Sequence, residues 1–321
     1  MDGVRGGPLR LLVGPADAGR SLAELVAQAL GDPALAGEVL AHGGAWLGRE
    51  RVQDGARPVP AGSELTISRP PSGRYEQVVL DPAWIIYEDA DLLALDKPDG
   101  AYVEMTPWSV DGNLRAALAR FLAERDGVDA LLHLVHRLDR DTSGVLLFSK
   151  SPELNAALQR CFAERMAHKE YLALCAGEPA EDAFELATGH GRAAQGLFRV
   201  YPLAEIGRQL PERGGVVKPM TTRFAVERRA GDAALVRAIP LTGRTHQIRL
   251  HLAHLGHPLL GDTRYGGPMQ WRGVVLPGHL LHAEMLRLPH PRSGAPLELR
   301  AAVPAWVMSD SLSASVRPRS L

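Results

Sequence analysis

The chain has 321 residues, of which 45% are hydrophobic and 23% charged, and its formal net charge at pH 7 is -1. These proportions are typical of globular proteins and exclude disordered, coiled-coil and collagen-like chains. No apolar run approaches the roughly 18 residues that a membrane-spanning helix needs, and Met1–Gly14 lacks the apolar core of a secretory leader. We therefore expect a cytoplasmic protein without membrane contacts.

The first segment of the chain predicts a small α/β module. Gly19–Leu30 carries apolar side chains on one helical face, and a second helix is expected near Ala34–His42. Short strands follow and end at Ile67, and the turn-rich stretch Arg69–Gly73 indicates a linker. The expected organisation is therefore a small module over residues 1–70, a main domain over residues 76–308 and a disordered tail over residues 309–321.

In the main domain the sequence predicts interspersed strands and helices. A β-hairpin is expected from Trp84–Tyr87 and Leu92–Leu95, and a helix between the capping residue Asn113 and Gly127. The further expected elements are a helix from Ser151 to about Arg165, a helix near Thr245–Leu255, and strands at Val145–Phe148, Lys169–Ala176, Thr222–Glu227, Ala234–Ile239 and Ala283–Leu288. Because no regular βαβ repeat appears, we predict an α+β fold with a mixed, mostly antiparallel central sheet and flanking helices.

The segment His136–Gly144 is a dense polar string directly before a strand of buried type. Its last three residues favour a loop that holds Asp139 at the edge of the sheet. A carboxylate between Arg137 and Arg140 should have a lowered pKa and stay ionised, which makes Asp139 a candidate nucleophile. An exposed, ion-paired loop explains the same spacing. A metal site at Asp139 and Asp141 is not expected, because no further oxygen ligands follow at regular intervals.

A second polar cluster is Gly243–His251, in which Arg244, His246 and Gln247 are donors suited to phosphates, base edges or anionic side chains. It lies in the stretch His190–Val275, which has thirteen basic and five acidic residues. Nearly all of these bases are arginine, which suits phosphate contacts, although a GC-rich genome produces the same excess.

Histidines in the same region suggest a zinc hypothesis, because His251, His254 and His257 repeat every three residues. No acidic or cysteine partner completes a ligand set, so no metal is expected. The two cysteines, Cys161 and Cys175, are too few for a disulfide framework and also lack metal-ligand spacing.

His136–Gly144 resembles the signature of the RluA family of pseudouridine synthases, which isomerise selected uridines in RNA. Further segments resemble family motifs in the family's order: Glu88–Gly100, Lys169–Ala173, Lys218–Thr222, Leu241–Asp262 and Leu281–Ala283. Together they extend from about Tyr87 to Pro304, some two thirds of the chain. Several long motifs in order are far more specific than any one of them.

The resemblance implies the pseudouridine synthase fold and an isomerase that uses neither cofactor nor metal. Asp139 matches the catalytic aspartate, Arg249 the arginine that pairs with it, and Tyr171 the residue that packs on the uracil ring. Attack on the anomeric carbon, attack on the base and proton abstraction from the sugar have all been argued for the family, and these routes stay open. The target base must be flipped out of its stack, and Arg137 matches the arginine that fills the vacated space.

We expect ribosomal or transfer RNA as the partner, no DNA, and a monomer. Besides Arg137, the side chains expected to contact RNA are Arg140, Lys169, Arg244, His246 and Gln247. Residues 1–70 resemble, more loosely, the alpha-L RNA-binding module that precedes many such synthases. Seven arginines there face eight acidic residues, so a plain structural appendage stays open.

Several alternatives to these assignments remain. A non-catalytic RNA-binding protein with the same fold is one, although Asp139, Tyr171 and Arg249 together argue against it. A glycosidase-type hydrolase is another, disfavoured because no acid partner accompanies Asp139. By propensity Tyr171 is also consistent with a core aromatic, and Lys97 with a surface lysine beside a turn.

Overall fold

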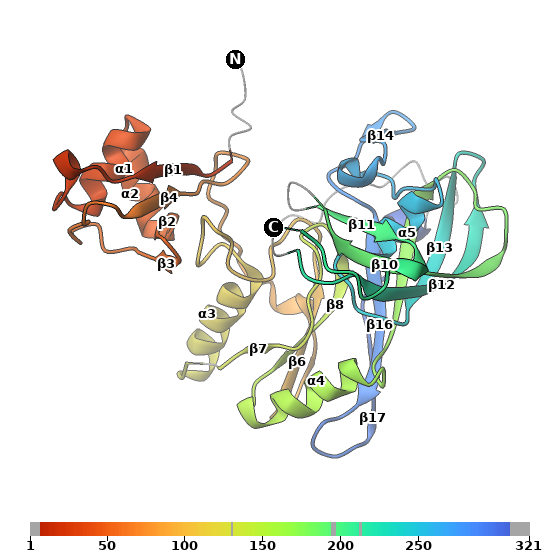
Figure 1. Ribbon diagram of the computed structural model, residues 1–321. Coiled ribbons are helices and arrows are strands. Elements are labelled where there is room, and N and C mark those ends of the chain that lie inside the picture. Colours follow the sequence, from red (N-terminus) through yellow and green to blue (C-terminus); the bar gives the residue numbers. More distant parts are fainter. Residues whose placement is uncertain (1–6, 130, 194–196, 212–213, 309–321) are drawn as a thin grey trace. The chain divides into compact units, whose positions relative to one another are not determined.

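The computed structural model describes residues 7–129, 131–193, 197–211 and 214–308 (Figure 1). The chain divides into two compact units, one formed by Met1–Leu80 with Tyr102–Asp129 and the other by Asp81–Ala101 with Ala130–Leu321. This division differs from the predicted boundary near residues 70–76, because Tyr102–Asp129 groups with the N-terminal segment and not with the main domain. The tail expected over residues 309–321 lies outside the described residues.

The N-terminal part of the first unit, the N-terminal module, combines a small sheet with two α-helices around one core. Its strands follow the order β1-β4-β2-β3. The elements are β1 (Leu9–Leu12), α1 (Leu22–Leu30), α2 (Pro33–His42), β2 (Ala45–Leu47), β3 (Glu50–Arg51) and β4 (Glu64–Ile67). A capping box joins Ser21 and Glu24 at the start of α1, and the Asp32 side chain accepts hydrogen bonds from the first turn of α2. Both predicted helices are confirmed.

The segment Tyr102–Asp129 contains α3 (Leu114–Asp126), which begins and ends as predicted. The Asn113 side chain accepts from the backbone at the helix start, and Gly127 ends the helix in the left-handed conformation. The loop before α3 is bonded to the N-terminal module: Trp46 Nε1 donates to the Pro107 carbonyl at 2.8 Å, across 61 positions of sequence. No local sequence pattern predicts such a long-range bond. The domain boundary predicted from the sequence therefore differs from the division seen in the structure.

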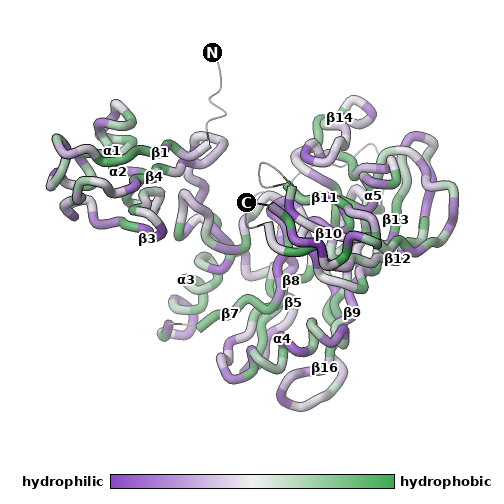
Figure 2. The backbone as a smooth tube through the Cα atoms, viewed as in Figure 1, coloured by the Kyte–Doolittle hydropathy of each residue, from purple (hydrophilic) through white to green (hydrophobic). Residues whose placement is uncertain are grey.

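The second unit is built on one large sheet whose described strands follow the order β11-β10-β12-β13-β9-β16-β8-β6-β5, with β17 on β16 and β7 on β8. The strands are β5 (Ile85–Glu88), β6 (Leu92–Lys97), β7 (His133–Leu134), β8 (Ser143–Ser149), β9 (His168–Ala176), β10 (Ala183–Arg192), β11 (Phe198–Tyr201), β12 (Lys218–Arg229), β13 (Ala233–Pro240), β16 (Leu281–Pro289) and β17 (Pro296–Arg300). All these pairs are antiparallel except β8 with β16. The predicted α+β class with a mostly antiparallel sheet is confirmed. β6 and β8, whose residues are all buried, pair with each other near the β5 edge of this sheet, and Figure 2 shows the backbone coloured by hydropathy.

Gly144 lets β8 and β16 approach each other where the polar 136–142 segment ends. Its φ is +107°, and a Cβ atom there would lie 2.2 Å from the Ala283 carbonyl oxygen. A side chain is therefore excluded by both backbone conformation and space. This close approach fixes the start of β8, and with it the loop that carries Asp139.

Two helices of the second unit flank the candidate site. The helix predicted from Ser151 begins instead as a 3-10 turn, Pro152–Leu154, and continues as α4 (Asn155–Ala163) without a side-chain cap from Ser151. The second helix, α5 (Gln247–His254), is buried along most of its length. Short elements complete the unit: β14 (Gln270–Trp271), β15 (Val274–Val275) and α6 (Ala305–Met308). A search of the described residues for helices with the length and apolar character to cross a membrane found none.

Candidate active site

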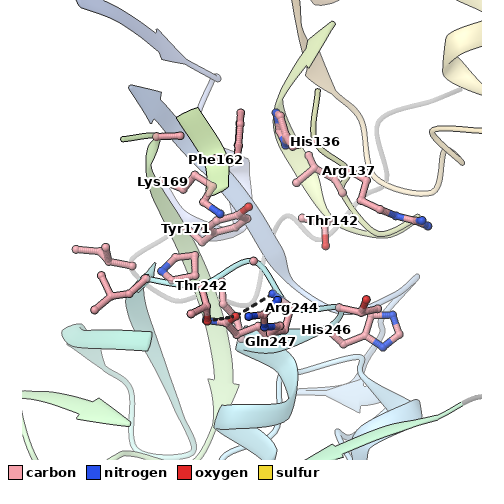
Figure 3. A pocket seen from close by; sticks show the side chains of 18 of the residues that line it. His136, Arg137, Thr142, Phe162, Lys169, Tyr171, Thr242, Arg244, His246 and Gln247 are labelled. Carbon is pink, nitrogen blue, oxygen red and sulfur yellow. Dashed lines mark hydrogen bonds between the residues drawn. The ribbon is translucent and has the colours of Figure 1, made fainter. Parts of the chain in front are cut away.

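A cavity of about 610 Å³ opens in the second unit, within the size range of small-molecule sites. Three segments line it: the loop before β8, the first half of β9 with the end of α4, and the turn that leads into α5. Figure 3 shows side chains from all three around one space, with Tyr171 and Lys169 from β9 facing His136, Arg137 and Thr142, and with Thr242, Arg244, His246 and Gln247 completing the ring. Asp139 and Arg249 line the same cavity, so the three predicted catalytic residues share one site.

The two carboxylate oxygens of Asp139 differ in their environment. Oδ2 accepts a hydrogen bond from Arg249 Nη1 at 2.8 Å. No hydrogen-bond donor meets Oδ1 among the described residues, and His246 Nε2 lies 3.6 Å from it. Because Oδ1 keeps its lone pairs available at the cavity, it is the oxygen that can react.

Arg249 is itself anchored from behind by Asp262. Its Nε and Nη2 atoms donate to the two oxygens of Asp262 at 2.7 and 2.8 Å, a bidentate arrangement that fixes the plane of the guanidinium. Arg249 and Asp262 are 6% and 2% exposed, so the pair is shielded from water. Asp262 belongs to the segment that resembles the family's arginine-rich motif, but sequence reasoning gave it no role.

The carboxyl of Asp139 is held ionised. Burial alone would raise its pKa, but the interactions of the carboxyl with His246, Arg249 and His279 together outweigh burial and keep the pKa below its usual value. Burial lowers the pKa of His246 to about 4 and that of His279 to about 3, so of these three groups only Arg249 carries a positive charge at neutral pH. The pKa shifts in the predicted direction, but the groups that lower it lie far along the chain, and Arg140 pairs with Asp141 instead.

Tyr171 and Lys169 project from β9 into the cavity (Figure 3). Burial, and then the charge of Asp139, raise the pKa of Tyr171, so the phenol keeps its proton. What Tyr171 offers at neutral pH is therefore a ring face and a neutral hydroxyl. Burial also lowers the pKa of Lys169, whose Nζ lies 5.8 Å from the centre of the Phe162 ring.

Lys97 is a buried anchor of the loop that carries Asp139 and not a surface lysine. It is fully buried, and its Nζ donates to the carbonyls of Pro98 at 2.7 Å and Arg140 at 2.8 Å. Burial lowers its pKa to about 7. Because Arg140 follows Asp139 directly, the second bond holds the loop immediately beyond the Asp139 carboxylate.

The predicted RNA contacts fall into two groups. Arg137, Lys169, Arg244 and His246 line the cavity, whereas the Arg140 side chain is not among its lining residues. Gln247 lines the cavity, but its oxygen accepts from Thr242 and from the Arg244 amide, and its nitrogen donates to the Thr221 carbonyl and the Thr222 hydroxyl. Its amide is thus fully used inside the protein, so the predicted RNA contact of Gln247 is not supported, and the side chain instead shapes the Arg244 turn.

Sequence reasoning missed Arg165, which follows α4 with a left-handed backbone, at φ 61°, and lines the cavity. It is exposed, and its charge adds to burial in lowering the pKa of Arg244. Neither arginine forms an ion pair with a described carboxylate. Two unneutralised guanidinium groups therefore lie near each other at this cavity.

Two of the three histidines that suggested zinc, His251 and His257, are engaged in other bonds. His251 is buried, with one ring nitrogen 3.0 Å from the Thr188 hydroxyl and the other 2.9 Å from the Thr222 hydroxyl. Within the part of the chain that the structure describes, no group of three or more His, Cys, Asp or Glu side chains is arranged to hold a metal ion.

Comparisons with known proteins point to one family. Residues 91–254 match the family model described as RNA pseudouridylate synthase. RNA pseudouridine synthase 1 of Oryza sativa subsp. japonica is 36% identical over 289 residues, covering 78% of this chain and 81% of that protein. Ribosomal large subunit pseudouridine synthase C of Escherichia coli (strain K12) is 37% identical over 227 residues, covering 68% of this chain and 65% of that protein.

Solved structures show the same architecture. Human RNA pseudouridylate synthase domain containing 1 superposes with a TM-score of 0.55 at 26% identity, covering 74% of this chain and 90% of that one. Human RNA pseudouridylate synthase domain containing 4 also gives a TM-score of 0.55, at 23% identity, covering 70% of this chain and 90% of that one. The second likeness shows the fold alone.

Proposed function

This chain belongs to the RNA pseudouridylate synthase family, and we propose that it isomerises specific uridines of ribosomal or transfer RNA with Asp139 as its catalytic carboxylate. One observation carries the proposal: an ionised aspartate presents a free oxygen to the same cavity that Tyr171 and Arg249 line. A relative named for the large ribosomal subunit makes ribosomal RNA the first substrate to test.

The isomerisation breaks the bond between N1 of uracil and C1′ of ribose, forms a bond from C5 to the same C1′, releases the C5 proton to water, and leaves N1 to take up a proton from water. Each of the three routes argued for the family needs Asp139 ionised. Arg249 meets this need by holding Oδ2 while leaving Oδ1 open. The Tyr171 ring supplies a flat apolar surface against which a detached uracil can turn without leaving the cavity.

Binding of the flipped nucleotide needs positive charge at the cavity, because each nucleotide brings a phosphate. Arg137 is exposed there, and Lys169, Arg165 and Arg244 line the same space. We assign these four side chains to the RNA backbone around the target uridine. The cost of unstacking the base, a few kcal/mol, is offset by these contacts and by stacking on Tyr171.

The N-terminal module is proposed as an additional RNA contact. Its helix–helix–strand order is that of the module expected from the sequence. Part of its polar surface is already engaged within its own unit, since Trp46 and Arg51 donate to the carbonyls of Pro107 and Thr106. The contribution of the module is therefore tested by deleting charge outside this contact, at Arg10 and Arg49, and measuring RNA affinity.

Release of tritium from RNA labelled at C5 of uridine tests the function. The protein is incubated with labelled ribosomal and transfer RNA transcripts, and the modified position is mapped in the transcript that releases label. Site-specific release supports the proposal. Tight RNA binding without release from any transcript would instead support the alternative of a non-catalytic RNA-binding protein.

A further inference from the structure

Tyr265 and His246 form a polar chain that ends at the catalytic carboxylate. Tyr265 lies in the 3-10 turn Thr263–Tyr265, and its hydroxyl oxygen is 2.7 Å from His246 Nδ1. On the other side of the imidazole, Nε2 faces Asp139 Oδ1 at 3.6 Å. We propose that Tyr265 fixes the tautomer of His246 with its proton on Nε2, so that this N–H orients the reactive oxygen. Both are positioning residues, and the inference rests on the proposed function of Asp139.

The direction of the first hydrogen bond follows from the surroundings of Tyr265. The Tyr265 hydroxyl lies 2.7 Å from His246 Nδ1, and burial raises the pKa of the phenol, which therefore keeps its proton. The phenol thus has a proton to donate, and His246 Nδ1 is the acceptor within reach. A ring nitrogen that accepts a hydrogen bond carries no proton itself.

The imidazole is neutral at physiological pH, so only one of its nitrogens carries a proton. Burial lowers its pKa to about 4. Nearby charges act on this pKa in both directions. The carboxylates of Asp139 and Asp262 raise it, and the guanidinium groups of Arg249 and Arg264 lower it. With Nδ1 accepting from Tyr265, the proton is on Nε2 and points toward Oδ1 of Asp139. The opposite tautomer would place a lone pair against a carboxylate oxygen, which is repulsive.

The ring is held in this orientation by packing and by its backbone. The Phe198 and Tyr265 rings meet the His246 ring edge-on, with centroids 5.8 and 5.6 Å away. The backbone of His246 has φ 56° and ψ 25°, a left-handed conformation that is uncommon for residues other than glycine. The distance of 3.6 Å between His246 Nε2 and Asp139 Oδ1 is longer than a hydrogen bond, so the lone pairs of Oδ1 stay available. In enzymes such long contacts commonly shorten when substrate binds.

A double-mutant cycle on the full-length protein tests the chain. Tyr265→Phe should lower kcat for tritium release by up to about tenfold, the value of one hydrogen bond, with KM for RNA nearly unchanged. His246→Ala should lower kcat further, and adding Tyr265→Phe to it should cost nothing more. Tyr87→Phe is the matched control, because it also removes a bonded tyrosine hydroxyl, but outside the cavity lining. It should leave kcat unchanged.

Nitrogen NMR of protein labelled at histidine reads the tautomer directly and needs no activity. The signal absent from His246→Ala identifies His246, which should show a protonated Nε2 in the wild type and lose this preference in Tyr265→Phe. A protonated Nδ1 in the wild type would overturn the inference, as would an equal loss of kcat from Tyr265→Phe with and without His246. Absence of tritium release from the wild type would refute the proposed function, while the NMR result would still decide the tautomer.

Discussion

Replacing Asp262 with Asn should loosen Arg249 without altering the lining of the cavity, which does not include Asp262. The variant keeps the shape of the side chain but loses the charge that meets Arg249 Nε and Nη2 at 2.7 and 2.8 Å. Removing one partner of a buried ion pair costs about 3–5 kcal/mol. Here Asp139 remains as a second partner and Asn keeps one acceptor, so we expect a smaller loss, about 2–3 kcal/mol of unfolding free energy. For a unit of this size the loss corresponds to a Tm lower by about 4–12 °C.

The same change should lower kcat for tritium release by about 10- to 100-fold, because the guanidinium no longer holds Asp139 in one place, while KM for RNA stays within about threefold. Thermal denaturation and single-turnover release measure the two effects. Asp232→Asn is the control: its ion pair with Arg272 is half-exposed, and its loss should cost about 1 kcal/mol or less. An Asp262→Asn protein with wild-type kcat, whatever its Tm, would refute the anchoring of Arg249 by Asp262.

Three further changes test other parts of the site. Lys97 has a pKa of about 7 when folded against 10.5 ordinarily, so between these pH values the folded state binds fewer protons than the unfolded state. Relative to Lys97→Met, the free energy of unfolding should therefore rise with pH by up to about 1.4 kcal/mol per pH unit. Urea titrations at pH 7, 8 and 9 measure this rise, and parallel curves for the two proteins would contradict it. Arg165→Ala should weaken RNA binding and reduce the slope of log affinity against log salt by about 0.7, whereas Arg160→Ala, on α4 but outside the cavity, should leave the slope unchanged. Gly144→Ala, whose Cβ would lie 2.2 Å from the Ala283 carbonyl, should prevent stable folding. Gly294→Ala, in open space at φ +71°, is the control and should lower the free energy of unfolding by only about 1–3 kcal/mol. A soluble, active Gly144→Ala enzyme would show that β8 and β16 separate freely.

The predictions that hold are those with local signals. The helix between Asn113 and Gly127 has a cap, apolar periodicity and a terminal glycine, and it begins and ends where these signals place it. The helix predicted from apolar periodicity within Gly19–Leu30 forms as α1. The catalytic set followed from ordered motifs, and Asp139, Tyr171 and Arg249 do line one cavity. The Ser151 start failed because the serine side chain makes no capping bond and the chain first forms a 3-10 turn.

What the sequence could not predict depends on residues far apart along the chain. Lys97 looked exposed because its neighbours form a turn, yet it reaches the Arg140 carbonyl 43 positions away. Gln247 looked like an RNA contact because it lies among arginines, and its amide is satisfied by β12 and the Arg244 turn. The proposed role of Tyr265 depends on His246, at the start of α5, lying within hydrogen-bond distance of it across 19 positions. Such contacts form only when the sheet is assembled, so no spacing of residues along the sequence predicts them.

The central claim is that one ionised carboxylate performs the isomerisation, and Asp139→Asn tests it most directly. The substitution keeps the size of the side chain and leaves the Arg249–Asp262 pair in place. On RNA that the wild type modifies, labelled at C5 of uridine, the variant should release no detectable tritium and bind the RNA about as tightly as the wild type. Tritium release by a folded Asp139→Asn protein at a rate near that of the wild type would contradict the account.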